Sequence, residues 1–94
     1  MILPTEGVYT IYTKSECVYC DRVKELLKKE KTVVVNCDEI LIQSRDEFLH
    51  TMDRLTHKEH RTFPFVFHHM NFIGGCDDTN LYYQNNQLTF DDDF

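Results

Sequence analysis

The sequence lacks any long uninterrupted run of apolar residues, and no segment approaches the roughly 20 residues that a membrane-spanning helix requires. Its start, Met1 to Pro4, has neither the basic flank nor the apolar run of a secretory signal peptide. Low-complexity stretches, internal repeats and linkers are also missing. We therefore expect a folded chain that is cytoplasmic and does not associate with a membrane.

Positive charge is scarce as well. Ten Lys and Arg residues stand against 16 Asp and Glu, for a formal net charge of −6, and the end of the chain is acidic. This balance argues against non-specific attraction to nucleic acid or to an anionic membrane surface. A chain of 94 residues has room for one hydrophobic core, so the sequence predicts a single domain over residues 1–94.

Four cysteines are present, but only Cys17 and Cys20 are closely spaced. In a compartment that keeps thiols reduced, such a pair is typical of redox chemistry or metal binding. The alternative to redox chemistry is half of a structural zinc site, which needs two more ligands at compatible positions. No second closely spaced Cys or His pair fits that need, so we predict no bound metal. Cys37 and Cys76 are expected to be buried and without a catalytic role.

Runs of β-branched and aromatic residues predict four strands, at residues 8–13, 32–36, 64–68 and 71–73. Because proline cannot donate to a sheet ladder, Pro64 is expected at the first position of its strand. A tight turn at residues 69–70 would join the last two strands into an antiparallel hairpin. His68 and His69 are expected to alternate across the strand, one ring inward and one outward.

Three segments predict helices. Apolar residues at helical spacing mark the first, at 20–30, with a polar opposite face. A capping box at 44–47 marks the start of the second. Acidic residues open the third, at 77–84, which the asparagines at 85–86 would end in a left-handed conformation before an acidic tail at 87–94.

The element order is β-α-β-α-β-β-α, and its first crossover must be right-handed. This order predicts an α/β chain with the thioredoxin-like fold. Its four-stranded mixed sheet, in the order 2-1-3-4, would be flanked by three helices.

The spacing of Cys17 and Cys20 places both sulfurs on the first turn of a helix, with Cys17 exposed at the N-terminus. Free backbone N–H groups, the helix dipole and the nearby Lys14 would favour a negative sulfur. Such surroundings lower a thiol pKa from about 8.5 to about 3.5–7.5, so Cys17 is the predicted attacking thiolate. Cys20, further inside, is the predicted resolving thiol.

Residues 14–20, K-S-E-C-V-Y-C, resemble the glutaredoxin active site, whose usual form is K-x-x-C-P-Y-C. The R-T-F-P at 61–64 is similar to the family's R-T-V-P, in which the proline has a cis peptide bond. Residues 66–67 and 73–78 resemble its V-F and I-G-G-C-D-D segments. The resemblance spans residues 8 to about 88 and rests on three separated motifs in the right order.

This resemblance implies a groove for glutathione. Lys14 and Arg61 would hold the glycine carboxylate, and the backbone of Phe63, next to Pro64, would pair with the cysteinyl peptide. Tyr19 would line the groove beside the reacting sulfur.

At the other end of the groove, the resemblance places the γ-glutamyl group at the start of the third helix. The backbone of Gly75, Cys76 and Asp77 would bind its carboxylate, and Asp77 or Asp78 its amine.

The implied activity is glutathione-dependent thiol–disulfide exchange on disulfide-bonded or glutathionylated proteins, by a monomer with no bound nicotinamide or flavin. One departure from the pattern is Val18, which replaces the usual proline. Some glutaredoxins without that proline hold a [2Fe–2S] cluster between two subunits, through the first cysteine and glutathione. A cluster carrier or sensor that uses Cys17 in this way is therefore the alternative function.

Overall fold

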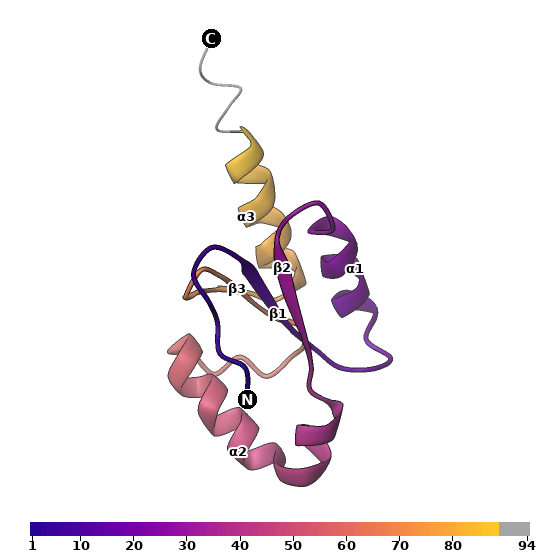
Figure 1. Cartoon of the computed structure of the whole chain (residues 1–94), viewed down its shortest axis with the longest axis vertical. Coiled ribbons are helices and arrows are strands. Elements are labelled where there is room, and N and C mark those ends of the chain that lie inside the picture. The colour runs from indigo at the N-terminus through magenta and orange to yellow at the C-terminus, as the bar shows by residue number, and fades with distance from the viewer. Residues whose placement is uncertain (89–94) are drawn as a thin grey trace.

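The computed structural model describes residues 1–88 and contains a four-stranded sheet (Figure 1). Its strands are β1 (Tyr9–Thr13), β2 (Thr32–Asn36), β3 (Phe65–His68) and β4 (Asn71–Gly74), in the order β2-β1-β3-β4. β1 pairs in parallel with β2 and antiparallel with β3, which pairs antiparallel with β4. The predicted fold class and strand order are confirmed.

Within residues 1–88, three helices cover the two faces of this sheet: α1 (Val18–Leu26), α2 (Asp38–Thr56) and α3 (Cys76–Leu88). Side chains of β1 alternate between the faces, since Tyr12 packs with Phe48 and Met52 of α2 while Ile11 packs with Val23 of α1. α3 joins the second cluster through Tyr82 and Tyr83. One face of the sheet therefore packs against α2, and the other against α1 and α3.

The bounds of α1 differ from the prediction at both ends. Cys17 is the N-cap, and its Sγ accepts a hydrogen bond from the Cys20 N–H, so the helix begins at Val18 rather than residue 20. It ends at Leu26 because the chain turns there: the Lys28 N–H bonds to the Glu25 carbonyl, three residues back. The helix was predicted to extend further because Leu27, just after the helix end, is also buried and so continues the apolar pattern.

The second helix was predicted to start at residue 44, but α2 contains a further helical segment before that residue. The helix begins at Asp38, whose backbone N–H donates to the Asn36 side chain at 2.9 Å. Ser44 interrupts it, with φ −160° and ψ 76°, and the axis kinks there. Ser44 therefore has the non-helical backbone expected at a helix start, but it lies between two helical segments instead of at the first residue of α2. The preceding turn exists because Ile40 and Leu41 pack against the core.

The predicted end of α3 was also wrong, because residues 85–86 continue the helix to Leu88. Partners distant in sequence hold α3 in place: the Tyr83 hydroxyl donates to Glu30 at 2.9 Å, and Tyr82 hydrogen-bonds His68. Of the predicted acidic tail, residues 89–94 lie outside the described part of the chain.

The two neighbouring histidines do not alternate across β3 as predicted. The turn at residues 69–70 is present, and His69 adopts its left-handed conformation with φ 55°. This backbone brings the two rings face to face, with centroids 4.1 Å apart. Tyr9 stacks on the other side of His68 at 4.0 Å.

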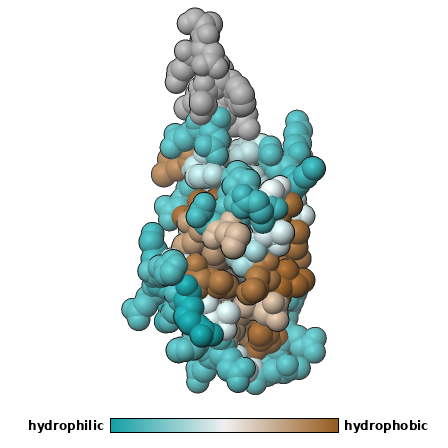
Figure 2. Space-filling view, turned by 60° about the vertical axis from the view of Figure 1, so that its left-hand side comes forward, coloured by the Kyte–Doolittle hydropathy of each residue, from teal (hydrophilic) through white to brown (hydrophobic). Residues whose placement is uncertain are grey.

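One face of the molecule shows hydrophobic side chains gathered across its middle, with hydrophilic ones above and below (Figure 2). Within residues 1–88, no helix combines the length and the apolar character needed to cross a membrane.

Candidate active site

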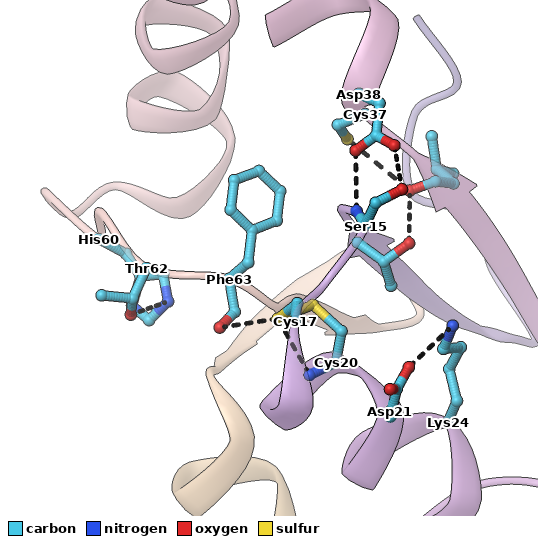
Figure 3. Close-up of a disulfide and its surroundings, with 12 residues drawn as sticks. Ser15, Cys17, Cys20, Asp21, Lys24, Cys37, Asp38, His60, Thr62 and Phe63 are labelled. Carbon is cyan, nitrogen blue, oxygen red and sulfur yellow. Dashed lines mark hydrogen bonds and ion pairs between the residues drawn. A yellow bond between two sulfur atoms is a disulfide. The ribbon is translucent and has the colours of Figure 1, made fainter.

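Cys17, at the end of the loop between β1 and α1, forms a disulfide with Cys20 in the first turn of α1, with a Cα–Cα distance of 5.2 Å (Figure 3). The Cys20 N–H donates to the Cys17 Sγ at 3.2 Å. A helix N-terminus with an N–H aimed at sulfur stabilises negative charge on that sulfur once the disulfide is reduced.

The two sulfurs differ in access. Cys17 is 9% exposed and Cys20 is fully buried, which confirms their predicted order. Cys17 is nevertheless less exposed than predicted, because the Phe63 carbonyl oxygen lies 3.9 Å from its Sγ and closes that side. The two residues that follow Cys17, Val18 and Tyr19, are exposed, at 62% and 53%.

The loop before Cys17 is fixed to α2. Asp38 accepts a hydrogen bond from the Ser15 N–H at 2.8 Å and another from its hydroxyl. These bonds are the main reason that the pKa of Asp38 lies below its ordinary value. Glu16, between Ser15 and Cys17, takes a left-handed conformation with φ 53°. Asp38 was not predicted from the sequence, although parallel β1 and β2 bring the residues that follow them to one sheet edge.

The segment opposite Cys17 contains the Phe63–Pro64 peptide bond, which is cis as the family resemblance implied. Pro64 is buried and precedes β3 rather than beginning it, since the strand starts at Phe65. The Phe63 ring stacks on Phe48 of α2 with centroids 5.6 Å apart. The Lys14 Nζ lies 5.6 Å from the centroid of the same ring.

A first pocket, which we call the Cys17 pocket, lies beside the reactive loop. It is lined by residues from the loop, α2 and the segment before β3, among them the predicted Lys14, Cys17, Tyr19, Arg61 and Phe63. Arg45 and Thr62 also line it and were missed. Arg45 is the first residue after the α2 kink at Ser44.

A second pocket, the α3 pocket, shares Tyr19, Thr62 and Phe63 with the first. Its remaining lining residues are Arg22, His60, Gly75, Cys76, Asp77 and Asp78. Four of these come from the predicted site at the start of α3; Arg22 and His60 had no recognisable signal. The predicted binding residues therefore lie around two adjoining pockets, with Cys20 and Pro64 buried behind them.

Arg61 makes a two-point ion pair with Asp53 of α2. The Nη1–Oδ1 and Nη2–Oδ2 distances are 2.6 Å and 3.0 Å. The hydrogen bonds from Arg61 are the largest cause of the lowered pKa of Asp53.

The other two cysteines differ from each other. Cys37 is buried as predicted, and burial raises the pKa of its thiol to about 11. Cys76 is only partly buried, contrary to the prediction, because it opens α3 at the wall of a pocket. Burial still raises its pKa, Asp77 adds to the rise, and Arg22 opposes it. Among residues 1–88, no group of three or more Cys, His, Asp or Glu side chains is arranged to hold a metal ion.

A disulfide at a helix start, facing a cis-proline segment on a thioredoxin-like sheet, defines a thiol–disulfide redox protein. Residues 9–73 match the glutaredoxin family model. The chain belongs to the glutaredoxin family, within the thioredoxin-like superfamily, and Cys17 and Cys20 are its redox-active pair.

Among curated proteins, glutaredoxin 1 of Rickettsia bellii is 39% identical over 70 residues, which cover 72% of this chain and 68% of that protein. The chloroplastic glutaredoxin-C5 of Arabidopsis thaliana is 38% identical over 77 residues, 80% of this chain. The chain spans only 42% of the Arabidopsis protein's length.

Two solved structures share the fold at appreciable identity. The holo form of glutaredoxin C1 from Populus tremula x tremuloides has a TM-score of 0.70 at 30% identity, over 90% of this chain and 75% of that one. A buckwheat glutaredoxin–glutathione complex has a TM-score of 0.65 at 26% identity, over 86% and 72%.

Proposed function

We propose that this protein is a glutathione-dependent thiol–disulfide oxidoreductase in which Cys17 is the attacking thiolate. The observation that carries the proposal is the arrangement of the two pockets, which adjoin at Tyr19, Thr62 and Phe63 beside the Cys17–Cys20 disulfide. A tripeptide with a charged group at each end and a sulfur in the middle fits such a layout.

The first step transfers glutathione to the enzyme. The Cys17 thiolate, stabilised by the start of α1 and the Cys20 N–H, attacks the glutathione sulfur of a glutathionylated protein. The S–S bond of the substrate breaks, and the protein substrate leaves as a thiolate. A Cys17–glutathione mixed disulfide forms in its place.

A second glutathione completes the cycle. Its thiolate attacks the glutathione sulfur of the mixed disulfide, which releases Cys17 as a thiolate and forms oxidised glutathione. Alternatively, Cys20 attacks the Cys17 sulfur, releases glutathione and forms the intramolecular disulfide seen here. Both electrons come from glutathione thiols, so the reaction needs no bound nicotinamide or flavin.

Glutathione would lie across both pockets. Lys14 and Arg61, which line the Cys17 pocket, would bind its glycine carboxylate. The start of α3, where Gly75 and Asp77 line the α3 pocket, would bind the γ-glutamyl end. A buckwheat relative has been solved as a glutathione complex, which supports the choice of ligand.

The first prediction separates the roles of the two cysteines. Cys17→Ser should abolish reduction of a glutathionylated peptide, because Cys20 is buried and burial raises the pKa of the Cys76 thiol, so neither supplies an exposed thiolate. Cys20→Ser should keep much of this activity, because a second glutathione can resolve the mixed disulfide, but should lose reduction of protein disulfides. The measurement is turnover in a coupled assay with glutathione and its reductase. Equal loss in both variants would contradict the monothiol step.

A cluster-bridged dimer is the second candidate, because Val18 and Tyr19 beside Cys17 are exposed and apolar enough to meet another copy. The chain alone does not fit a [2Fe–2S] cluster: within residues 1–88 no three-ligand group exists. Glutathione and a partner copy would have to complete the ligands. Anaerobic purification with glutathione that yields a monomer without iron or visible absorbance would exclude this candidate.

A further inference from the structure

The ion pair between Arg61 and Asp53 constrains how the guanidinium can act. Asp53 lies on the last turns of α2, and Arg61 lies in the segment that connects α2 to β3. Two nearly parallel bonds, at 2.6 Å and 3.0 Å, attach the end of the guanidinium to one carboxylate. Such two-point contacts fix orientation, whereas a single bond lets the group rotate.

Arg61 has N–H donors that its bonds to Asp53 and His60 leave unused. A guanidinium has five N–H groups. Nη1 uses its two on Asp53 and on the His60 carbonyl at 3.4 Å, and Nη2 uses one on Asp53. The Nε–H and the second Nη2–H remain, and neither has a partner among the described residues. These two donors point the same way along one side of the guanidinium, in the spacing that matches a second carboxylate.

Arg61 lines the Cys17 pocket together with Lys14, where the proposed function places the glycine carboxylate of glutathione. We infer that Asp53 is a positioning residue, which holds the end of the Arg61 guanidinium so that its free side binds this carboxylate. The inference rests on the proposed function and adds a residue of α2 that does not line the pocket itself.

The alternative role for Asp53 is competition with glutathione for Arg61, and it predicts the opposite effect on binding. If Asp53 competed with glutathione for Arg61, removing its charge would tighten binding. The side chains of Arg61 and Asp53 are 40% and 36% exposed, so the pair contributes little to folding. Substitution of Asp53 should therefore change ligand binding without unfolding the protein.

The test uses Asp53→Asn, which keeps the shape but loses the charge and one acceptor. With a glutathionylated peptide, we expect KM to rise about three- to tenfold while kcat changes less than about twofold. Asp53→Glu, which keeps the charge, should recover part of the effect. Asp46→Asn is the matched control: it changes the same charge at an exposed position of the same helix, away from both pockets, and should leave KM unchanged.

A binding measurement keeps this test independent of turnover. The probes are S-methylglutathione, which cannot react, and its C-terminal amide, which lacks the glycine carboxylate, titrated into the oxidised protein by NMR. Asp53→Asn should weaken binding of the acid about three- to tenfold and leave the amide unaffected. An Arg61→Gln background should remove the effect of Asp53→Asn.

The outcomes separate the two claims. If S-methylglutathione binds tightly in a manner that depends on Asp53, but the protein shows no glutathione-linked turnover, the proposed function is wrong and the inference stands. If the parent protein turns over normally but Asp53→Asn binds S-methylglutathione as tightly as the parent or more tightly, the inference alone is overturned. Failure of the parent protein to bind S-methylglutathione would overturn it as well.

Discussion

The four cysteines of this chain differ in reactivity because their surroundings differ. Cys17 is at a helix start beside a pocket, and Cys20 is buried behind it. Cys37 lies in the core, where burial raises its pKa to about 11, so it stays a protonated thiol at neutral pH. Alkylation of the reduced protein should therefore reach Cys17 well before Cys37.

Two glycines with positive φ give a matched pair of substitutions. A Cβ at Gly74, where φ is 141°, would lie 2.7 Å from the Asp78 Cβ, whereas a Cβ at Gly7, where φ is 88°, would meet nothing within 4 Å. Both Gly→Ala changes carry the backbone strain of positive φ, about 1–3 kcal/mol, but only Gly74→Ala adds a clash. Urea unfolding should show the larger loss for Gly74→Ala.

The clash has its own control. Because Asp78 lies in the first turn of α3 beside Gly74, the added methyl group must push the start of this helix away. Asp78→Ala should recover part of the stability lost by Gly74→Ala and none of that lost by Gly7→Ala. Equal losses for the two single substitutions would contradict the close approach.

Sequence motifs identified residues that line the pocket of the reacting sulfur but not residues that act through others. Cys17, Lys14 and Phe63 belong to short patterns whose spacing is visible along the chain. Asp38 and Asp53 are single carboxylates whose importance depends on partners distant in sequence. A motif cannot reveal such a partner, because only the folded chain brings the two together.

At the scale of elements, α2 shows how tertiary packing overrides a local signal. A capping box at 44–47 is a valid helix start, and Ser44 does leave the helical conformation. The chain is already helical from Asp38, however, because Ile40 and Leu41 gain core contacts there. The resulting kink precedes Arg45, which lines the Cys17 pocket.

The end of α2 offers a stabilising substitution. His57 caps the helix in a left-handed conformation with φ 60°, and its N–H donates to the Asp53 carbonyl. Glycine adopts this conformation without the steric cost of a Cβ, so His57→Gly should raise the free energy of unfolding by about 0.5–1 kcal/mol. His50→Gly, in the interior of the same helix, should lower it by about 0.3 kcal/mol. Urea unfolding with the same sign for both changes would contradict the capping role.

At the scale of the whole molecule, the sheet order was predictable because few connections are sterically allowed. A right-handed crossover places β2 beside β1 in parallel, and a tight turn must pair β3 with β4. Periodicity also identified the packed faces: Phe48 and Met52 lie on one side of the sheet and Val23 on the other. Helix ends were less predictable, because contacts such as Tyr83 with Glu30 depend on elements far apart in sequence. The single-domain and cytoplasmic assignments stay predictions.

His68 connects several of these elements. It lies on β3, stacks on Tyr9 of β1, and hydrogen-bonds the Tyr82 hydroxyl of α3 at 2.6 Å. On its other side it meets His69, whose Nδ1 accepts from the Gly7 N–H. A positive charge on His68 would therefore disturb its contacts with β1, with α3 and with the turn after β3.

Acid should destabilise the protein through this residue. Burial, helped by His69, lowers the pKa of His68 below its ordinary 6.5, while Glu30 and Glu6 oppose the shift. Since the unfolded chain then binds a proton more readily than the folded one, the contribution is complete above about pH 6.5 and is lost as pH falls through the folded pKa. Urea unfolding between about pH 7.5 and 5.5 measures this loss. His68→Phe keeps a flat ring against Tyr9 but cannot titrate, so its stability should fall less with acid; an equal fall in parent and variant would assign the acid sensitivity to other groups.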